Sequence, residues 1–391
     1  MDVSIKQPKL LAALRVVARA AKGATSLMPV QSHVLIRAEL DESGTSLSAS
    51  SGVVALRADV EMDIAEPGAV CVPATELLNI VKELNSDASV RICTEPLSHS
   101  EARSHAEARK VRLLSGTLVH RLNGLASRVF PKEADATSVQ WAVFDAEALV
   151  SALAKCLPHV GRDESRVALT GVCIERAADR VVMVATDGHR LKVTNCRTTF
   201  EGVESKVGDQ WLAPRQGLAE LMSVLKVAKN VERVRVGFTD SVMVASVEGV
   251  HVQATLTESA YPNWRAIVPA PSGGRAAFEV IRGALMKAVS RVTAAARRED
   301  VQLKLSVTNN VMSLRYSSSA DAVDQIDVFS VGEQGGNAEV GINYRLLLDA
   351  LAATDTDDAI ISIDGLAPVM VEPRQEVTDD EMAIIMPMRL S

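Results

Sequence analysis

The residues of this chain that could carry out catalysis are few, and one aspartate–histidine pair stands out among them. Asp187 and His189 lie two positions apart in the segment TDGHR. On a β-strand, residues i and i+2 point to the same face, so the aspartate could orient the histidine as a general base. The chain has no GxSxG, HExxH or Walker-type glycine motif to accompany the pair. A structural or surface-lining role is favoured, and no catalytic residue is expected.

Histidines and cysteines could bind a metal ion or form disulfides. His99 and His105 lie in the polar segment 98–110, SHSEARSHAEARK. No strong additional ligands are spaced around them, so a solvated loop insertion in a hairpin is favoured over a metal site. The five cysteines are scattered and never form a CxxC pair, which is typical of buried free thiols in a reducing compartment.

The N-terminal sequence and the hydropathy of the chain bear on its location. The first residues lack the basic start, apolar run and cleavage site of a signal peptide. No stretch approaches the roughly 18 consecutive apolar residues of a membrane-spanning helix. The sequence therefore predicts a cytoplasmic protein that does not bind a membrane, metal or cofactor.

Basic side chains could bind phosphate groups, although the formal net charge of the chain is −7. Residues 5–22 and residues 281–298 each contain five basic residues and no acidic residue. The basic residues are Lys6, Lys9, Arg15, Arg19 and Lys22, followed by Arg282, Lys287, Arg291, Arg297 and Arg298. Contacts with phosphates bind DNA without reading its sequence. This separation favours a basic surface for the DNA backbone and an acidic exterior, although ordinary solvated helix faces remain the alternative for either helix alone.

Three copies of one plan must position these residues. An amphipathic helix, a second helix about 60 residues later and a proline-containing segment recur in this order. The expected ranges are 8–22, 145–160 and 281–297 for the first helix, 73–85, 214–230 and 343–355 for the second, and 129–131, 260–262 and 385–387 for the proline segment. Leu14, Leu153 and Val289 fall at comparable positions of the first helix.

Alternating runs rich in valine and isoleucine surround these helices and predict strands, as at 233–238, 242–247, 301–307 and 359–364. We therefore predict an α+β fold of three similar domains, each with two helices packed on antiparallel sheets. The expected domains are 1–137, 138–270 and 271–391.

Three motifs in register with this repeat resemble segments of the bacterial DNA polymerase III beta subunit family, the sliding clamps. They are ATDGHRL at 185–191, YPNWRAIVP at 261–269 and IIMPMRL at 384–390. The resemblance covers essentially the whole chain. It implies a head-to-tail homodimer, a ring of six domains whose helices surround duplex DNA. Such a ring is a non-catalytic processivity factor that tethers a polymerase to DNA.

The same resemblance implies a peptide-binding pocket between the second and third domains. DNA polymerase III alpha subunit, the clamp loader, other DNA polymerases and repair proteins would dock there through short linear motifs. The matching positions are Leu169, Thr186, Gly188, His189, Arg190, Leu191, Pro262, Ile267, Pro368, Ile384, Ile385, Met386, Pro387, Met388, Arg389 and Leu390. The expected DNA-facing residues are Lys6, Lys9, Arg15, Arg19, Lys22, Arg166, Arg215, Arg282, Lys287 and Arg291.

The chain departs from the family pattern at several positions. The basic residue that follows the arginine of the YPNWR segment in the family is Ala266 here, which alters one side of the pocket. At the expected dimer contact the chain has Ala294 and Ala295 opposite His120, and small side chains bury less area.

Two alternatives to a replicative clamp remain. A specialised or inhibitor-resistant clamp paralogue would use the altered pocket, and an enzyme using Asp187 and His189 is a distant third. The chain has no helix-turn-helix or zinc-ligand pattern of a sequence-specific DNA-binding protein.

Overall fold

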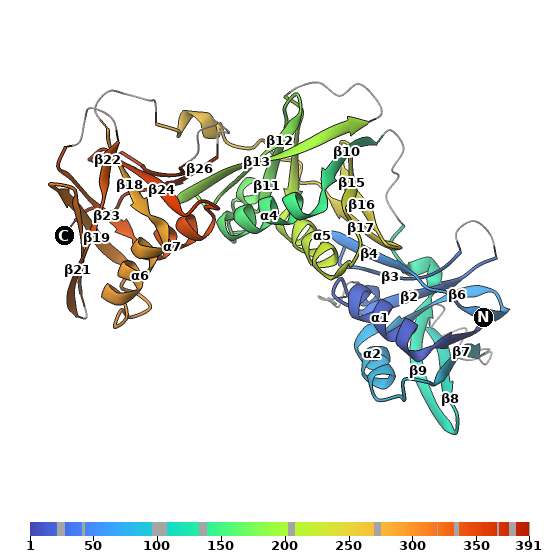
Figure 1. Cartoon of the computed structure of the whole chain (residues 1–391). Helices are drawn as coiled ribbons and strands as arrows, with labels where there is room; N and C mark the ends of the chain where they lie inside the picture. Colours follow the sequence, from blue (N-terminus) through green and yellow to red (C-terminus); the bar gives the residue numbers. More distant parts are fainter. Residues whose placement is uncertain are drawn as a thin grey trace. The chain divides into compact units, whose positions relative to one another are not determined.

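The computed structural model describes residues 1–21, 28–40, 44–95, 108–132, 139–201, 208–269, 275–318, 320–331, 336–365, 367–374 and 381–390. Three similar modules follow one another along the chain, each with two α-helices and antiparallel strands (Figure 1). The predicted α+β class and the threefold repeat are confirmed. The expected boundaries near 137 and 270 lie outside the described residues and stay predictions.

The first module begins with a strand that leads directly into its first helix. In chain order it comprises β1 (Asp2–Lys6), α1 (Gln7–Val17), β2 (His33–Ala38), β3 (Thr45–Ser50), β4 (Val54–Asp59), β5 (Asp63–Glu66), β6 (Gly68–Pro73), α2 (Ala74–Lys82), β7 (Ser89–Glu95), β8 (Ala108–Ser115) and β9 (Leu118–Ala126). Helix α1 packs against α2 and covers β3 and β4. Most of the 98–110 insertion, including His99 and His105, lies outside the described residues.

The second module repeats this order. It comprises β10 (Gln140–Asp145), α4 (Ala146–Cys156), β11 (Gly171–Arg176), β12 (Arg180–Thr186), β13 (Arg190–Glu201), β14 (Gln210–Pro214), α5 (Arg215–Val227), β15 (Arg233–Phe238), β16 (Val242–Val247) and β17 (Val250–Thr255). A short 3-10 turn, Leu157–His159, continues α4.

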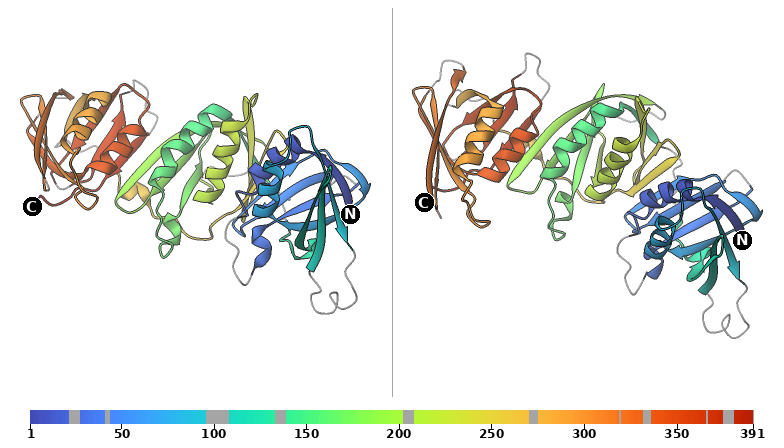
Figure 2. Two further views of the ribbon diagram at one scale, coloured as in Figure 1. Left: turned by 90° about the horizontal axis from the view of Figure 1, so that it is seen from below. Right: turned by 60° about the horizontal axis from the view of Figure 1, so that its bottom comes forward.

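The third module ends with the C-terminal strand. It comprises β18 (Ala276–Ile281), α6 (Arg282–Val292), β19 (Gln302–Thr308), β20 (Val311–Ser317), β21 (Asp321–Asp327), β22 (Phe329–Val331), β23 (Ala338–Asn343), α7 (Tyr344–Ala352), β24 (Asp358–Ile363), β25 (Val369–Pro373) and β26 (Met382–Ile385). In the first and third modules the two helices lie side by side (Figure 2).

The chain forms two compact units, and strands from different modules join within each of them. One unit is made mainly of Met1–Ala146 and Gln216–Leu256, the other mainly of Glu147–Thr199 and Thr257–Ser391. In the first unit the strand order β10-β15-β16-β17-β4-β3-β2-β6-β9-β8-β7-β1 runs across the β17–β4 junction. In the second unit the order β14-β11-β12-β13-β26-β25-β24-β18-β22 runs across the β13–β26 junction. Each junction is thus an antiparallel strand pair between two modules.

The first helices of the repeat are shorter than the sequence suggested. Helix α1 ends at Val17 and α6 at Val292, whereas the apolar pattern predicted helix to 22 and 297. After Val17 the backbone forms tighter turns, in which an amide donates a hydrogen bond to the carbonyl three residues earlier. The Ala20 amide, for example, donates to the Val17 carbonyl at 3.0 Å. Such tightened turns preserve the apolar spacing for a few residues beyond the α-helix, so periodicity alone placed the ends too late.

The core positions expected from the repeat are confirmed. Leu14, Leu153 and Val289 are all completely buried. The strands predicted at 233–238, 242–247, 301–307 and 359–364 are β15, β16, β19 and β24, each within one residue. The five cysteines are free and buried, as expected, and burial raises the pKa of Cys156 to about 12.

We predict that Leu153→Ala destabilises the protein by about 2–5 kcal/mol, because it leaves a cavity beneath α4. Val227→Ala removes methyl groups from a side chain that is 73% exposed in α5 and should change stability by no more than about 0.5 kcal/mol. Urea unfolding of both variants checks this. Equal effects of the two substitutions would contradict the assignment of Leu153 to the core.

Candidate interaction site and basic helix surface

The C-terminal strand completes the sheet of the central module. Strand β26 pairs with β13 in antiparallel register, with Arg190 opposite Ile385 and Leu191 opposite Ile384. The Met386 amide continues this pairing by donating to the His189 carbonyl at 2.9 Å. The structure therefore brings together two of the three motifs singled out in the sequence, 185–191 and 384–390.

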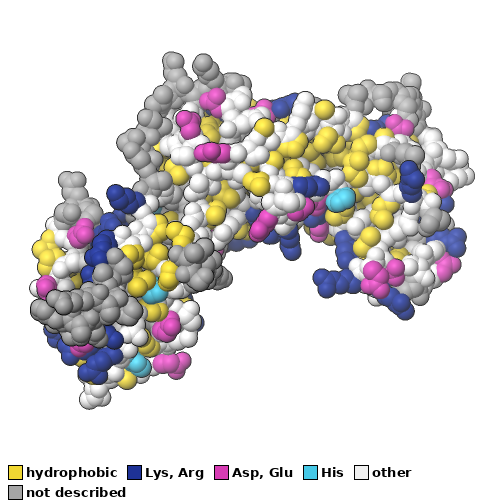
Figure 3. Space-filling model, turned by 180° about the vertical axis from the view of Figure 1, so that it is seen from behind, with side chains coloured by type: hydrophobic (Ala, Val, Ile, Leu, Met, Phe, Trp, Pro, Cys, Tyr) yellow, Lys and Arg dark blue, Asp and Glu magenta, His cyan; other side chains and the backbone are white. Residues whose placement is uncertain are grey.

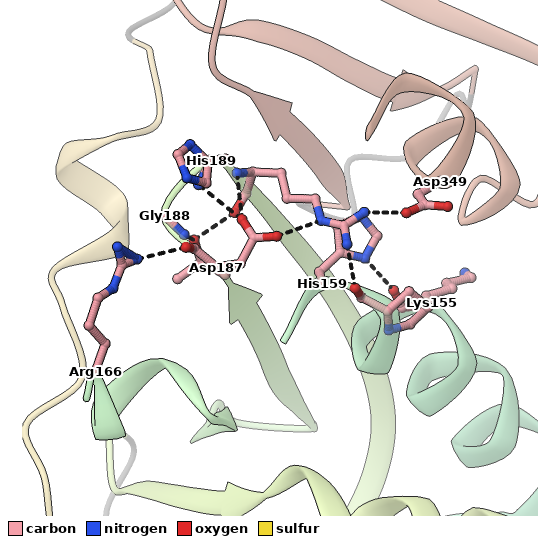
Figure 4. A network of polar contacts seen from close by, with 10 residues as sticks. Lys155, His159, Arg166, Asp187, Gly188, His189 and Asp349 are labelled. Atoms are coloured by element: carbon pink, nitrogen blue, oxygen red, sulfur yellow. Dashed lines mark hydrogen bonds and ion pairs between the residues drawn. The ribbon is translucent and has the colours of Figure 1, made fainter. Parts of the chain in front are cut away.

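The turn between β12 and β13 is held by its own side chains. Gly188 has φ +91°, which favours glycine. The hydroxyl of Thr186 donates to the Arg190 carbonyl at 2.6 Å and accepts from the Gly188 amide at 3.1 Å. A Cβ on Gly188 would lie 2.2 Å from a guanidinium nitrogen of Arg166, and that guanidinium donates to the Asp187 carbonyl at 2.6 Å (Figure 4).

The expected strand placement of Asp187 and His189 is wrong, because both residues lie in this turn. The Asp187 carboxylate accepts from the His189 amide at 2.9 Å and from the Arg190 amide at 3.1 Å. Its second oxygen accepts from Nε of Arg190 at 3.0 Å. The carboxylate therefore orders the turn and Arg190 rather than orienting the imidazole of His189.

Arg190 ties the turn to the rest of the second unit. Its guanidinium donates to the Pro158 carbonyl at 2.6 Å and forms an ion pair with Asp349 of α7. With 11% of its side chain exposed, Arg190 is a positioning group that links elements of two modules. A planar guanidinium suits this task because it offers several donors in fixed directions.

An apolar cluster lies beside this turn. Leu191, Trp264, Met370 and Ile384 are buried together, and Tyr261 packs against them. The Tyr261 hydroxyl donates to the Val184 carbonyl at 3.2 Å. The YPNWR segment, the third motif of the sequence, therefore packs on the β13–β26 junction.

Several of the predicted pocket residues remain exposed around the cluster. Ile267, Met386 and Leu390 are each 40–42% exposed, and Pro262 is also exposed. Apolar side chains gather on the face of the second unit that is seen in Figure 3. Exposed apolar and methionine side chains next to a buried cluster are typical of an adaptable binding surface.

The remaining pocket positions fall into two groups. Ile384 and Ile385 are completely buried and belong to the core. The other members are half-buried or exposed at its edge: Leu169, Pro368, Pro387, Met388 and Arg389.

The end of the chain leaves β26 and lies against β19 and β23 of the third module. The Met388 amide donates to the Gly341 carbonyl at 2.8 Å. The Gln302 side chain donates to the Arg389 carbonyl at 2.6 Å.

A buried charged network that the sequence did not reveal lies behind β26. Lys192 is fully buried and donates to Glu381 at 3.0 Å, and Lys155 of α4 pairs with the same carboxylate at 2.9 Å and with Asp355 at 2.5 Å. Burial lowers the pKa of Lys192. Burial also opposes the charge of Lys155, but its hydrogen bonds to Asp355 and Glu381 prevail and raise its pKa. One carboxylate thus holds two lysines in the interior.

His159, labelled in Figure 4, is buried within reach of the Arg190 charge. Its Nδ1 donates to the Lys155 carbonyl at 2.9 Å, and its Nε2 has no partner among the described residues. Burial, together with the charge of Arg190, lowers its pKa to about 4. His159 is therefore a neutral core histidine at physiological pH.

Arg265 occupies the side of the site where the family pattern is altered at Ala266. Its guanidinium pairs with Glu175 at 2.7 Å and lies 4.2 Å from the centroid of the Trp264 ring. Ala266 itself is exposed.

The basic residues of α1 and α6 differ in how far they are neutralised. Lys6, Arg15 and Lys287 are exposed and make no ion pair with a described residue. Lys9 pairs with Glu61. Acidic residues from other elements thus neutralise part of the charge predicted for these helices.

The other predicted DNA-facing residues have varied surroundings. Arg19 pairs with Glu220 at 2.8 Å and Arg291 with Asp324 at 2.7 Å, while Arg282 donates to the Thr356 carbonyl at 2.8 Å. Arg166 contacts the 186–190 turn, as described above. Arg215 is half-buried, and burial with the nearby Arg162 lowers its pKa. Lys22 lies outside the described residues.

The described residues also bear on a metal site and on a membrane-spanning segment. No group of three or more His, Cys, Asp or Glu side chains is placed there to hold a metal ion. No helix in the described ranges is long and apolar enough to cross a membrane.

Family models match three successive parts of the chain. They describe the N-terminal domain of the DNA polymerase III beta subunit at residues 1–108, its central domain at 144–263 and its C-terminal domain at 269–389. The motif at 185–191 lies within the central match, the motif at 384–390 lies at the end of the C-terminal match, and the motif at 261–269 spans the boundary between these two matches.

Curated relatives and solved structures agree with these matches. The beta sliding clamp of Pseudomonas aeruginosa is 26% identical, with 100% of both chains covered. That of Synechococcus elongatus is 25% identical, with 95% of this chain and 96% of the relative covered. The DNA polymerase sliding clamp of Bacillus subtilis superposes with a TM-score of 0.87 at 20% identity, and 100% of each chain is covered.

The likeness to the Bacillus subtilis structure concerns the fold, whereas the sequence matches extend over the three domains and the motifs of the site. The chain belongs to the DNA polymerase III beta subunit family, the non-catalytic sliding clamps.

Proposed function

We propose that the protein works as a DNA sliding clamp and processivity factor. Two chains would form a head-to-tail ring of six modules around duplex DNA and tether the replicative polymerase to it in the cytoplasm. The observation that carries this proposal is the match of three successive beta-subunit domains along one chain. The relatives from Pseudomonas aeruginosa and Synechococcus elongatus are beta sliding clamps, which does not favour a specialised paralogue.

The basic helices would form the DNA-facing surface of the ring. Exposed lysines and arginines in α1 and α6, among them Lys6, Arg15 and Lys287, would contact the phosphates of either strand. Such contacts do not depend on the base sequence. The net charge of −7 leaves the rest of the molecule acidic, which disfavours binding of DNA elsewhere.

The surface around the β13–β26 junction would bind partner peptides. Exposed apolar groups such as Ile267, Met386 and Leu390 lie beside a buried cluster that holds their backbone in place. DNA polymerase III alpha subunit, the clamp loader, other DNA polymerases and repair proteins would dock there one at a time through short linear motifs. A methionine-rich surface tolerates such varied partners.

The buried charges behind β26 would keep this partner surface in shape. Glu381 directly precedes β26, and its ion pairs with Lys155 and Lys192 fix the strand against α4 and β13. Loss of the carboxylate would leave two buried ammonium groups with too few partners, which is costly.

We expect topological retention on DNA. A clamp loader with ATP should place the protein on nicked circular plasmid, where it co-elutes with the DNA in gel filtration, and cutting the plasmid should release it. The reason is that a ring with only phosphate contacts slides off a free end. Tight, sequence-specific binding to linear DNA without a loader would contradict the ring, as would a solution mass equal to the single-chain 41.7 kDa.

Deleting Met388–Ser391 should abolish partner-peptide binding while the dimer persists. The truncation removes the backbone contacts of Met388 and Arg389 with the third module and the exposed side chain of Leu390. Binding is measured with a labelled peptide from the polymerase alpha subunit, and oligomeric state by light scattering. A truncated chain that no longer dimerises would mean that this segment belongs to the subunit interface.

Glu381→Gln should destabilise the second unit by about 3–5 kcal/mol, because it removes the carboxylate that pairs with the fully buried Lys192 and leaves Lys155 with Asp355 alone. The matched control is Asp355→Asn, which removes the second carboxylate that pairs with Lys155. The Asp355 side chain is 61% exposed, so this substitution should cost less than about 1 kcal/mol. Urea unfolding followed by tryptophan fluorescence gives both values. Hydrogen exchange at Met382–Ile385 should also quicken in Glu381→Gln only; equal behaviour of the two variants would rule out this role.

A further inference from the structure

The first unit contains a cavity at its own junction between modules. The cavity has a volume of about 290 Å³ and lies where β17 of the second module pairs with β4 of the first. This size accommodates one or two large side chains and is close to the lower end of ordinary ligand sites. The residues that line it are Ser48, Ser50, Gly52, Val53, Val54, Ala55, Leu56, Arg57, Phe130, Pro131, Lys132, Trp141, Val244, Ala245, Ser246, His251, Val252, Gln253 and Thr255.

Part of the lining is a continuous strip across four paired strands, β3, β4, β17 and β16. His251 lies opposite Arg57 and Gln253 opposite Ala55 across the junction. On the next strand, β16, Val244 lies opposite Gln253. Directly opposed residues on antiparallel strands share one face of the sheet, so these side chains form a continuous surface.

Aromatic and apolar groups complete the lining. Phe130 and Pro131 come from the segment that closes the first module, and Trp141 comes from β10. Trp141 lies opposite Gly237 of β15, where a Cβ would come within 2.9 Å of the indole and 2.3 Å of Val139. Glycine at this position therefore leaves room for the ring. Val53, in the turn before β4, is 45% exposed.

This cavity occupies the place in the first junction that the partner surface occupies in the second. The pair β4–β17 corresponds to β13–β26, since each joins a module to the one that follows it. The turn before β4 has Gly52 at φ +89°, and the turn before β13 has Gly188 at φ +91°. The segment 130–131, Phe-Pro, corresponds to 261–262, Tyr-Pro.

The charge of the cavity favours an acidic occupant. Arg57, Lys132 and His251 line it, and none of the described residues in its lining carries a carboxylate. Asp59 lies just beyond and accepts from Nε of Arg57 at 3.2 Å and from His251 at 2.9 Å. The Arg235 guanidinium lies 4.6 Å from the Trp141 ring centroid and pairs with Glu201 at 3.1 Å, so among the described residues the unpaired positive charge of the lining is that of Lys132.

We propose that this cavity is a second docking site, which binds an extended peptide segment with an aromatic or aliphatic side chain next to a carboxylate. The apolar side chain would enter between Phe130, Trp141 and Val244, and the carboxylate would face Arg57 and Lys132. The proposal rests on the proposed function, because it treats the first junction as a counterpart of the partner surface. A ring with such sites would hold two kinds of partner per chain.

The chain's three tryptophans provide the readout. Trp141 lines the cavity, Trp264 lies in the cluster under the partner surface, and Trp211 lies in β14 and belongs to neither set of residues. The full-length protein is labelled with 5-fluorotryptophan, and each ¹⁹F resonance is assigned by a Trp→Phe variant. The probes are acetyl-Phe-Glu-Leu-Glu-amide and its glutamine counterpart, acetyl-Phe-Gln-Leu-Gln-amide.

The acidic probe should shift the Trp141 resonance in a saturable manner, with an affinity at least threefold higher than the neutral probe. Gln253→Glu places a negative charge in the lining without changing its shape and should weaken the acidic probe at least fivefold. Gln325→Glu, an exposed position on β21, makes the same change in net charge elsewhere and should have no effect. Unshifted resonances in the unbound variants show that the fold is intact.

Three other outcomes would contradict the proposal, and the resonances that shift tell them apart. A shift at Trp264 alone would overturn the second site while leaving the partner surface in place. Equal affinities for the two probes, or equal effects of the two glutamine substitutions, would remove the charge selectivity. No shift at either Trp141 or Trp264 would overturn the second site, and retention on circular DNA would then decide separately whether the clamp proposal survives.

Discussion

Backbone pairing between strands of different modules is the interaction on which the rest of this structure depends. At β17–β4 and at β13–β26 a strand of one module completes the sheet of another. An unpaired strand edge carries rows of unsatisfied amides and carbonyls, so each pairing satisfies groups that a single module would expose. It also places segments that are distant in sequence on one surface. The meeting of the segments 185–191 and 384–390 at the candidate interaction site is a direct consequence.

The separation of basic and acidic side chains is the second constraint, and it affects the surface charge of the molecule rather than its fold. The acid-free helices leave Lys6, Arg15 and Lys287 exposed, while acidic residues of neighbouring elements pair with Lys9, Arg19 and Arg291. Exposed ion pairs add little stability. Their effect is to limit the basic charge that is open to solvent, and under the proposed function this would keep the phosphate contacts weak enough to be mobile.

The repeat was predictable from sequence because burial imposes a period. Leu14, Leu153 and Val289 recur since each must face its own core, and the strands alternate for the same reason. Lys192 and Glu381 gave no such signal: they are 189 positions apart, and a lysine within a strand normally indicates an exposed face. His159 likewise resembles any surface histidine until the fold buries it. Pairings between distant charges follow from tertiary structure, which no local pattern encodes.

The two junctions share the same antiparallel backbone pairing, but they differ in the side chains buried behind it. This difference bears on the role of the buried charges at the β13–β26 junction. Relative to Gly52 and Gly188, the position of Lys192 in β13 corresponds to that of Leu56 in β4, which is also fully buried. Apolar packing is thus sufficient to stabilise such a junction, as expected when buried ion pairs bring little net stability.

Strand β17 follows β16 through the two-residue turn 248–249, which fixes its register. Strand β26 is short and follows β25 after a longer connection. A slip of one residue would turn every side chain of β26 to the other face, and the pairing of Lys155 and Lys192 with Glu381 opposes that slip. We therefore infer that the charges specify register at the junction that carries the partner surface.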